Sequence, residues 1–271
     1  MKNFKYIFVL MVAFLIVSCE DVVDVDLNTA VPKLVIDASI TWQKGTLGNE
    51  QMIKLTTTFG YYDTTIPPAS GATVFITDSN NTVFNFIENL QTGEYFCSNY
   101  VPALNSDYML TVIYEGETYT AKETMKPVPQ IDKIEQRNDG GFGGDEIEIK
   151  VFLTDNAATE DYYLFRYKPN FTAIPIFDID RDEFFQGNQF SDFFTHEDLE
   201  SGHTIDITLY GISKTYYNYV NILTGIVGGG GPFQTPPATL RGNVVNTTNF
   251  NNYALGYFNV SETDFRHYIV E

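Results

Sequence analysis

The chain has few of the residues that most enzyme and metal sites use. Its 271 residues include two cysteines, three histidines and one tryptophan. Two cysteines cannot build a disulfide framework, and three histidines leave little material for a zinc site or a Ser-His-Asp triad. Basic residues are also scarce: 16 Lys and Arg stand against 35 Asp and Glu, which gives a net charge of −19. So acidic a chain repels phosphate backbones, and nucleic-acid binding is excluded.

Long apolar runs are rare too, and the longest is residues 6–17, after Lys2 and Lys5 and before Ser18 and Cys19. A helix that spans a bilayer needs about 20 apolar residues, so this run is too short. A basic start, a short apolar run and a small residue before the cut are typical of a secretory signal. The cysteine that follows resembles the bacterial lipoprotein box, which implies that Cys19 is acylated and opens the mature protein. A buried N-terminal element and a signal cut without lipid are the alternatives.

Removal of a signal peptide at residues 1–18 leaves a mature chain with a net charge of −21, since that segment carries two lysines and no acid. Residues 19–30 are predicted to be an acidic tether between the lipid and the folded part. Each methylene of a buried acyl chain contributes about 0.8 kcal/mol, so several chains would anchor the protein stably. Cys97 then has no partner, and its apolar surroundings favour a buried free thiol over a reactive nucleophile.

The next part of the chain carries seven short runs rich in β-branched and aromatic residues, with turn residues between them. The runs are 34–40, 52–58, 73–77, 82–87, 93–97, 107–114 and 118–124. They predict a β-sandwich over residues 31–126, of the immunoglobulin-like or transthyretin-like kind. Pro127 and Pro129 oppose both helix and ladder pairing, so residues 127–130 are predicted to link two domains.

A second series of strands predicts a larger and more irregular sandwich over residues 131–271. Its predicted strands include 146–153, 162–167 and 204–210, with the last two near 240–245 and 254–260. Residues 184–199 are polar and aromatic without clean periodicity, which indicates a long loop. Ser213 as N-cap and an apolar face at helical spacing predict one helix over 213–223, with Gly225 as the stop signal. The predicted fold class is therefore all-β, two tandem β-sandwich domains with one short helix in the second.

The sharpest local pattern for chemistry is Asp178, Asp180 and Asp182, because acids at alternate positions open calcium loops of the EF-hand type. The sixth position of such a loop is Glu183 here in place of glycine, and the twelfth is Gln189 in place of glutamate. A solvated acidic loop is therefore favoured over a calcium site. The glycine-rich stretch at residues 139–145 could be a ligand loop or a hairpin turn, and the hairpin turn is favoured.

The histidines and the loop aromatics are the other candidates for a site. His196 and His203 could gather a metal with nearby acids, but zinc-binding spacings are absent, so ordinary loop histidines are favoured. Aromatic side chains in or beside predicted loops would suit a sugar or protein partner if they are exposed. These are Trp42, Tyr61, Tyr62, Phe184, Phe185, Phe193 and Phe194. Packing under the loops is the alternative, and no cofactor is expected.

Several segments, spread over nearly the whole mature chain, carry a resemblance to a known family. They are residues 19–25, 34–38, 71–74, 93–95, 108–112, 116–121, 236–244 and 254–258. In this order they resemble the Bacteroidota lipoprotein family known as domain of unknown function 4249. The resemblance implies an outer-membrane lipoprotein, often encoded beside a TonB-dependent receptor, and it supplies no catalytic residues.

These observations predict a non-enzymatic binding or accessory module, lipid-anchored at Cys19 on the surface or periplasmic face of the outer membrane. The expected partners are that membrane and, by resemblance, a TonB-dependent receptor or another envelope protein. An adhesion or envelope-structural role is the alternative. A glycan or peptide hydrolase would need clustered acids or histidine in a cleft, which the sequence does not indicate.

Overall fold

Alternation of apolar and polar residues sets the strands of the first half. The computed structural model describes residues 31–60, 62–141, 143–228 and 240–271. Ile36, Ala38 and Ile40 alternate into the interior with no exposed surface, while the residues between them face outward. All seven predicted strands are confirmed: β1 (Leu34–Gln43), β2 (Gln51–Thr57), β3 (Thr73–Asp78), β4 (Val83–Glu88), β5 (Glu94–Cys97), β6 (Asp107–Tyr114) and β7 (Glu117–Thr124).

The second half is also built mainly of strands. They are β8 (Ile131–Gly140), β9 (Glu146–Thr154), β10 (Tyr162–Pro169), β11 (Ile176–Arg181), β12 (Gln189–Thr195), β13 (Thr204–Ile212), β14 (Val245–Asn246) and β15 (Leu255–Ile269). A short 3-10 helix, η1 (Asp182–Phe184), follows β11, and the α-helix α2 (Lys214–Gly228) follows β13. In the described part of the chain no helix is long and apolar enough to cross a membrane.

Two β-sandwich cores result from this order of strands. One sheet runs β11-β10-β13-β15-β1-β2-β5-β4-β3-β6-β7-β14, and a second runs β12-β9-β8. Strand β4 pairs with both β5 and β3, so the long sheet folds over there and encloses the first core. The second core lies between β10 and β13 on one side and β9 and β12 on the other, around Phe165, Leu209 and Val151.

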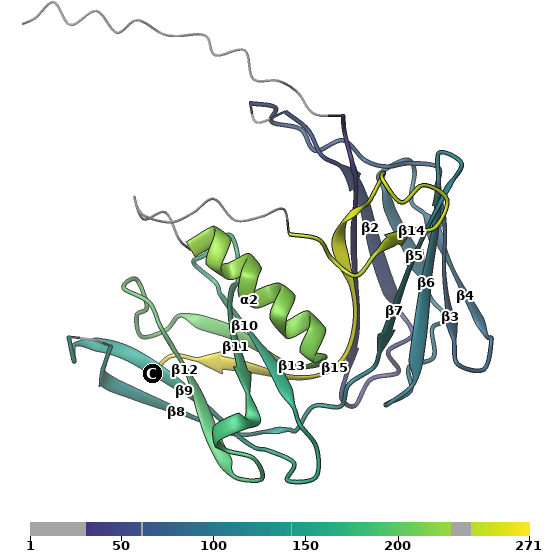
Figure 1. Ribbon diagram of the computed structural model, residues 1–271. Helices are drawn as coiled ribbons and strands as arrows, with labels where there is room; N and C mark the ends of the chain where they lie inside the picture. The colour runs from purple at the N-terminus through teal and green to yellow at the C-terminus, as the bar shows by residue number, and fades with distance from the viewer. Residues whose placement is uncertain (1–30, 61, 142, 229–239) are drawn as a thin grey trace, which may run out of the picture. The chain divides into compact units, whose positions relative to one another are not determined.

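Strand β15 belongs to both sandwiches, as its yellow ribbon in Figure 1 makes visible. Its first half pairs in parallel with β1, and its second half pairs antiparallel with β13. Phe258 and Val260 therefore lie in the first core, opposite Ala38 and Ile40. The expected division into consecutive stretches 31–126 and 131–271 differs from this arrangement. The reason is that β15 changes partners without any break in its own sequence.

The single helix is confirmed, and it is longer than predicted. Ser213 is the N-cap, since its Oγ accepts a hydrogen bond of 3.2 Å from the backbone N–H of Tyr216. The prediction that Gly225 stops the helix is wrong, because α2 continues to Gly228. Val220 and Tyr216 on its inner face pack against Leu164 and Ile212 of the sheet, and Figure 1 shows α2 lying across β10 and β11.

The prediction of a long loop over residues 184–199 is wrong, because β12 pairs with β9 along its whole length. Its inward positions are Asp192 and Phe194, and both are buried. An aspartate at a core position interrupts the apolar alternation by which a strand is recognised. Gly140 of β8 pairs with Glu146 of β9, so the described residues 141 and 143–145 lie in a hairpin connection, as predicted.

Candidate binding pocket

One pocket of the described chain has a floor built from three neighbouring strands. The register sets Gln43 of β1 opposite Thr263 of β15, and Thr263 opposite Tyr210 of β13. These three side chains form one row across the sheet, because residues paired across strands point to the same face. Thr41 and Thr208 lie two positions along their strands and face the same way. Residues far apart in the sequence are thus brought together by a rigid sheet.

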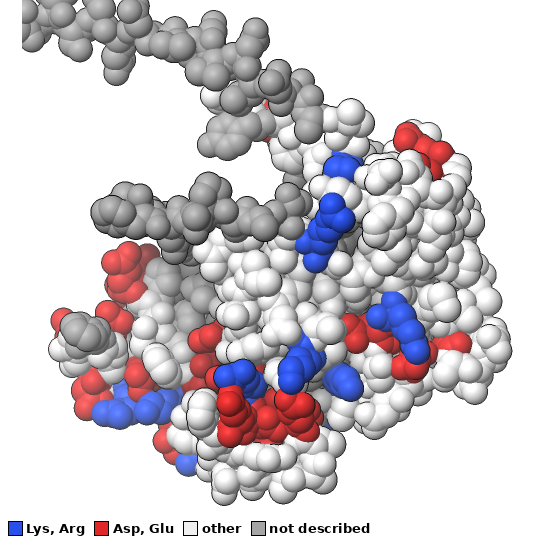
Figure 2. Space-filling view, viewed as in Figure 1, with Lys and Arg blue, Asp and Glu red and all other residues white. Residues whose placement is uncertain are grey.

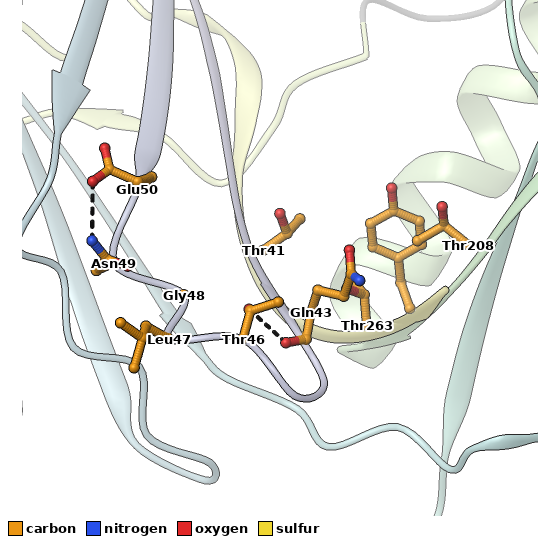
Figure 3. Close-up of a pocket in the computed structure, with 10 residues that line it drawn as sticks. Thr41, Gln43, Thr46, Leu47, Gly48, Asn49, Glu50, Thr208 and Thr263 are labelled. Atoms are coloured by element: carbon orange, nitrogen blue, oxygen red, sulfur yellow. Dashed lines mark hydrogen bonds between the residues drawn. The ribbon is translucent and has the colours of Figure 1, made fainter. Parts of the chain in front are cut away.

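The opposite wall of the pocket is the loop of residues 44–50 between β1 and β2 (Figure 3). Thr46 turns the chain back, since its backbone N–H and its hydroxyl both donate to the carbonyl oxygen of Gln43, at 3.1 and 2.7 Å. The indole N–H of Trp42 donates to the Thr46 carbonyl at 2.9 Å. Asn49 Nδ2 donates to Glu50 Oε1 and to the Ser98 carbonyl, both at 3.0 Å. The wall is therefore held by its own hydrogen bonds.

Lys44 ties this wall to the floor. Its backbone N–H donates to the Thr263 carbonyl at 2.9 Å, and its ammonium pairs with the buried Glu262 at 2.7 Å. The other contact of that Glu262 oxygen is the backbone N–H of Val128, at 2.9 Å. One carboxylate therefore joins the pocket loop, β15 and the segment that leads into the second sandwich. This network keeps the pocket preformed.

The pocket offers hydrogen-bonding groups and little charge. Its volume is about 560 Å³, within the range of small-molecule sites. Within the described chain, the side chains of Thr41, Gln43 and Thr263 make no hydrogen bond of their own. Burial raises the pKa of Tyr210, so its phenol stays neutral and can donate. Hydroxyls and an amide of this kind can bind a polar, uncharged group by several hydrogen bonds.

Few ionisable side chains line the pocket. Glu50 is the one ionisable carboxylate among its described lining residues, and neither histidine, cysteine nor lysine lines it. The other titratable side chain of the described lining is the phenol of Tyr210.

A separate group of carboxylates lies at one end of the second sandwich. Oxygens of Asp155, Asp161 and Asp182 lie within 4.8 Å of one another, the spacing of a metal site. Donors within the chain already occupy four of their six oxygens: the phenol of Tyr163 and the N–H of Gly187 on Asp155, Thr159 on Asp161, and the Asp161 N–H on Asp182. Burial and the neighbouring carboxylates raise the pKa of Asp161.

The three calcium candidates are not brought together. Asp182 joins the group just described, in η1, whereas Asp178 and Asp180 lie on the strand β11. A strand separates alternate side chains by nearly 7 Å, while a calcium loop must curl around the ion. Burial, together with the charge of Asp178, raises the pKa of Asp180 to about 6. Asp155 and Asp161 were missed in the sequence, because nothing marks two loop acids as neighbours of a third 21 residues or more away.

One known protein family matches most of the chain. The family described as "Domain of unknown function (DUF4249)" matches residues 20–266. The chain belongs to the DUF4249 family. A search of curated proteins found no match for it.

Solved structures with which this DUF4249 chain shares low sequence identity include the following three. A two-domain fibronectin type-III segment of chicken tenascin has 12% identity, covering 66% of this chain and 90% of that one, with a TM-score of 0.23. The FN1–FN3 domains of chicken CNTN1 have 14% identity over 67% and 60% of the two chains, with a TM-score of 0.24. A DUF4785 family protein from Legionella pneumophila has 12% identity over 68% and 54%, with a TM-score of 0.28.

Two of the three histidines, His196 and His203, make structural contacts in turns. His196 and His203 both pack against Phe171, with ring centroids 5.1 and 4.7 Å from it. The Nδ1 atoms of these two histidines accept the backbone N–H groups of Asp198 and Glu200, each at 3.1 Å. These contacts close two turns, and neither histidine lines the pocket.

The cysteine and aromatic candidates divide between core and surface. Cys97 is a buried free thiol, and burial raises its pKa. Phe194 is buried and Phe185 stacks on Phe190, whereas Tyr62, Phe184 and Phe193 are exposed. Trp42 packs partly on the first core beside the pocket. Tyr61, Cys19 and the tether at 19–30 lie outside the described residues.

Proposed function

We propose that this DUF4249 protein is a non-enzymatic binding module, anchored by lipid at Cys19 to the outer membrane and working beside a TonB-dependent receptor. The observation that carries the proposal is the preformed pocket whose floor is the row Gln43, Thr263 and Tyr210. The proposed location is supported by the lipoprotein-like start of the chain and by what the family resemblance implies.

The lining of the pocket favours a neutral, polar ligand. Threonine hydroxyls and the Gln43 amide each donate and accept, and Tyr210 adds a neutral phenol. A hydroxyl-bearing sugar or an exposed peptide segment presents groups of the same kind. An anionic ligand would meet the carboxylate of Glu50 without a matching cation among the described lining residues. The ligand is therefore a polar segment of the receptor or of its cargo that carries no negative charge.

Affinity purification of the lipidated protein from native outer membranes tests this function. Gln43→Trp fills the pocket from an exposed position on β1, so the core is left intact. The matched control is Gln130→Trp, on an exposed glutamine outside the pocket. We expect one envelope protein to co-purify stoichiometrically with the wild type and with the control, and to be lost with Gln43→Trp. Recovery of no companion, or of the same companion with all three proteins, would contradict the proposal.

A further inference from the structure

Two cations of the chain converge on one aromatic ring. The ammonium of Lys33 lies 3.9 Å from the ring centroid of Tyr253, and the guanidinium carbon of Arg241 lies 3.8 Å from it. The two charges are therefore at most 7.7 Å apart. We name these three residues the Tyr253 patch.

The fold fixes the positions of all three residues. Val35 pairs with Leu255 in the parallel ladder of β1 and β15, so Lys33 and Tyr253, two residues earlier on each chain, lie side by side. The backbone of Lys33 is also held by Thr58, through hydrogen bonds of 2.9 Å in both directions. Asn243 anchors the segment of Arg241 by exchanging hydrogen bonds of 2.8 and 2.9 Å with the backbone of Phe258.

The positive charge of the patch is not neutralised within the described chain. Nine of the fourteen described lysines and arginines form an ion pair with a carboxylate, but Lys33 and Arg241 form none. The face of the Tyr253 ring attracts both cations, and this attraction is of the same order as their mutual repulsion, so the ring can hold the two charges near each other. Figure 2 shows blue side chains without red in contact with them in the upper centre of the view, while most red side chains lie at the left and in the lower half and one group lies at the upper right.

We propose that the Tyr253 patch binds the phosphate of a lipid headgroup in the membrane that carries the anchor. Phosphate oxygens accept hydrogen bonds from ammonium and guanidinium groups at about 2.7–2.9 Å, so a headgroup phosphate can pair with a cation of the patch. Arg241 is exposed and Lys33 is half-buried, so both can be reached from solvent. The proposal rests on the proposed function for the lipid at Cys19.

The tether holds the folded part close to the membrane, so a weak contact of the Tyr253 patch with headgroups is enough to orient the protein. Lys33 lies fourteen positions after Cys19, so at most about 50 Å of chain joins them. Tethering of this length keeps the folded part at a high effective concentration next to the membrane. The acidic faces of the protein are repelled by anionic headgroups. The Tyr253 patch is then the face that meets the membrane.

Vesicle co-sedimentation tests the patch without the lipid anchor. The full chain with Cys19→Ser is mixed at low salt with vesicles of phosphatidylglycerol and phosphatidylcholine, or of phosphatidylcholine alone. Each cation near an anionic surface contributes about five-fold in partitioning, so Lys33→Gln with Arg241→Gln should weaken binding to the anionic vesicles about thirty-fold. Lys126→Gln with Arg166→Gln is the matched control, since both cations lack an ion pair in the described chain and the charge change is equal. Circular dichroism confirms that each variant is folded.

The results distinguish vesicle binding through the Tyr253 patch from an effect of net charge and from binding through the lipid anchor. Binding that is lost in the Lys33/Arg241 variant and kept in the control supports the proposal. Equal binding by both variants, or binding by wild type that does not depend on phosphatidylglycerol, overturns it. Saturable binding of millimolar inorganic phosphate without vesicles would assign the site to free phosphate and also overturn it. Acyl labelling at Cys19 is measured separately, so failure of the anchor and failure of the patch are distinguishable.

Discussion

Asp192 gives the clearest quantitative prediction. It lies on β12 with 5% of its surface exposed, and the phenol of the buried Tyr167 donates to its Oδ2 at 2.6 Å. Burial raises the pKa of Asp192 to about 7, with further contributions from the charges of Asp178 and Asp180. In the unfolded chain an aspartate has a pKa near 3.9. The folded state therefore holds this proton more tightly than the unfolded state does.

The sign of the pH dependence follows from this difference. The contribution of Asp192 to stability is fully present below about pH 4, and it is lost as the pH rises toward 7. From pH 5 to about pH 7 the folded state keeps this proton while the unfolded state has lost it, so the free energy of unfolding falls by about 1.36 kcal/mol per pH unit. Above pH 7 both states are ionised, and the free energy of unfolding changes little further. Asp192 alone should therefore lower the free energy of unfolding by about 3 kcal/mol over this range.

Asp192→Asn removes the titration and keeps an acceptor for Tyr167. Any cost of burying the amide N–H₂ group is the same at both pH values, so it cancels in the difference. Urea unfolding at pH 5 and pH 8, followed by circular dichroism, should show a pH effect smaller by about 3 kcal/mol than in the wild type. Asp198→Asn, at a side chain that is 72% exposed, is the control and should keep the wild-type pH effect. An equal pH effect in wild type and Asp192→Asn would refute the reasoning.

Three further predictions concern packing and reactivity. The buried Tyr100 hydroxyl has no partner in the described chain, so Tyr100→Phe should raise the free energy of unfolding by about 1 kcal/mol; a loss of stability would contradict this. A Cβ at Gly48, where φ is +64°, would lie 2.6 Å from the Trp42 ring, so Gly48→Ala should cost about 2 kcal/mol more in chemical denaturation than Gly45→Ala, which has open space around it. Cys97 is 2% exposed, so a thiol reagent should modify it only in urea, in a chain whose other cysteine is serine; rapid labelling of the native protein would count against burial.

The strands of the first sandwich are predictable from local sequence, because each buries one face and exposes the other. Runs such as Ile36, Ala38 and Ile40 carry that alternation openly. Strand β12 escapes the rule because Asp192 occupies a core position, where Tyr167 satisfies it. The information that stabilises this aspartate lies on β10, 25 residues away, so no local pattern can reveal it.

The pocket is less predictable than the strands. Its floor depends on the register of β1, β15 and β13, which sets Gln43, Thr263 and Tyr210 in one row. None of these residues belongs to a motif, and the switch of β15 from β1 to β13 leaves no mark in its sequence. The acidic pattern at residues 178–182 is local, so it can be recognised in the sequence. Its first two aspartates lie on the extended strand β11, however, and an extended strand cannot curl around a calcium ion.

Photo-crosslinking in native membranes tests the binding function most directly. A photoreactive amino acid replaces Leu47, which is 81% exposed on the pocket wall, or Leu90, which is 90% exposed on a turn away from the pocket. We predict that position 47 crosslinks to one envelope component and that position 90 does not. Absence of a crosslink at position 47, or the same product from both positions, would contradict a binding role for the pocket.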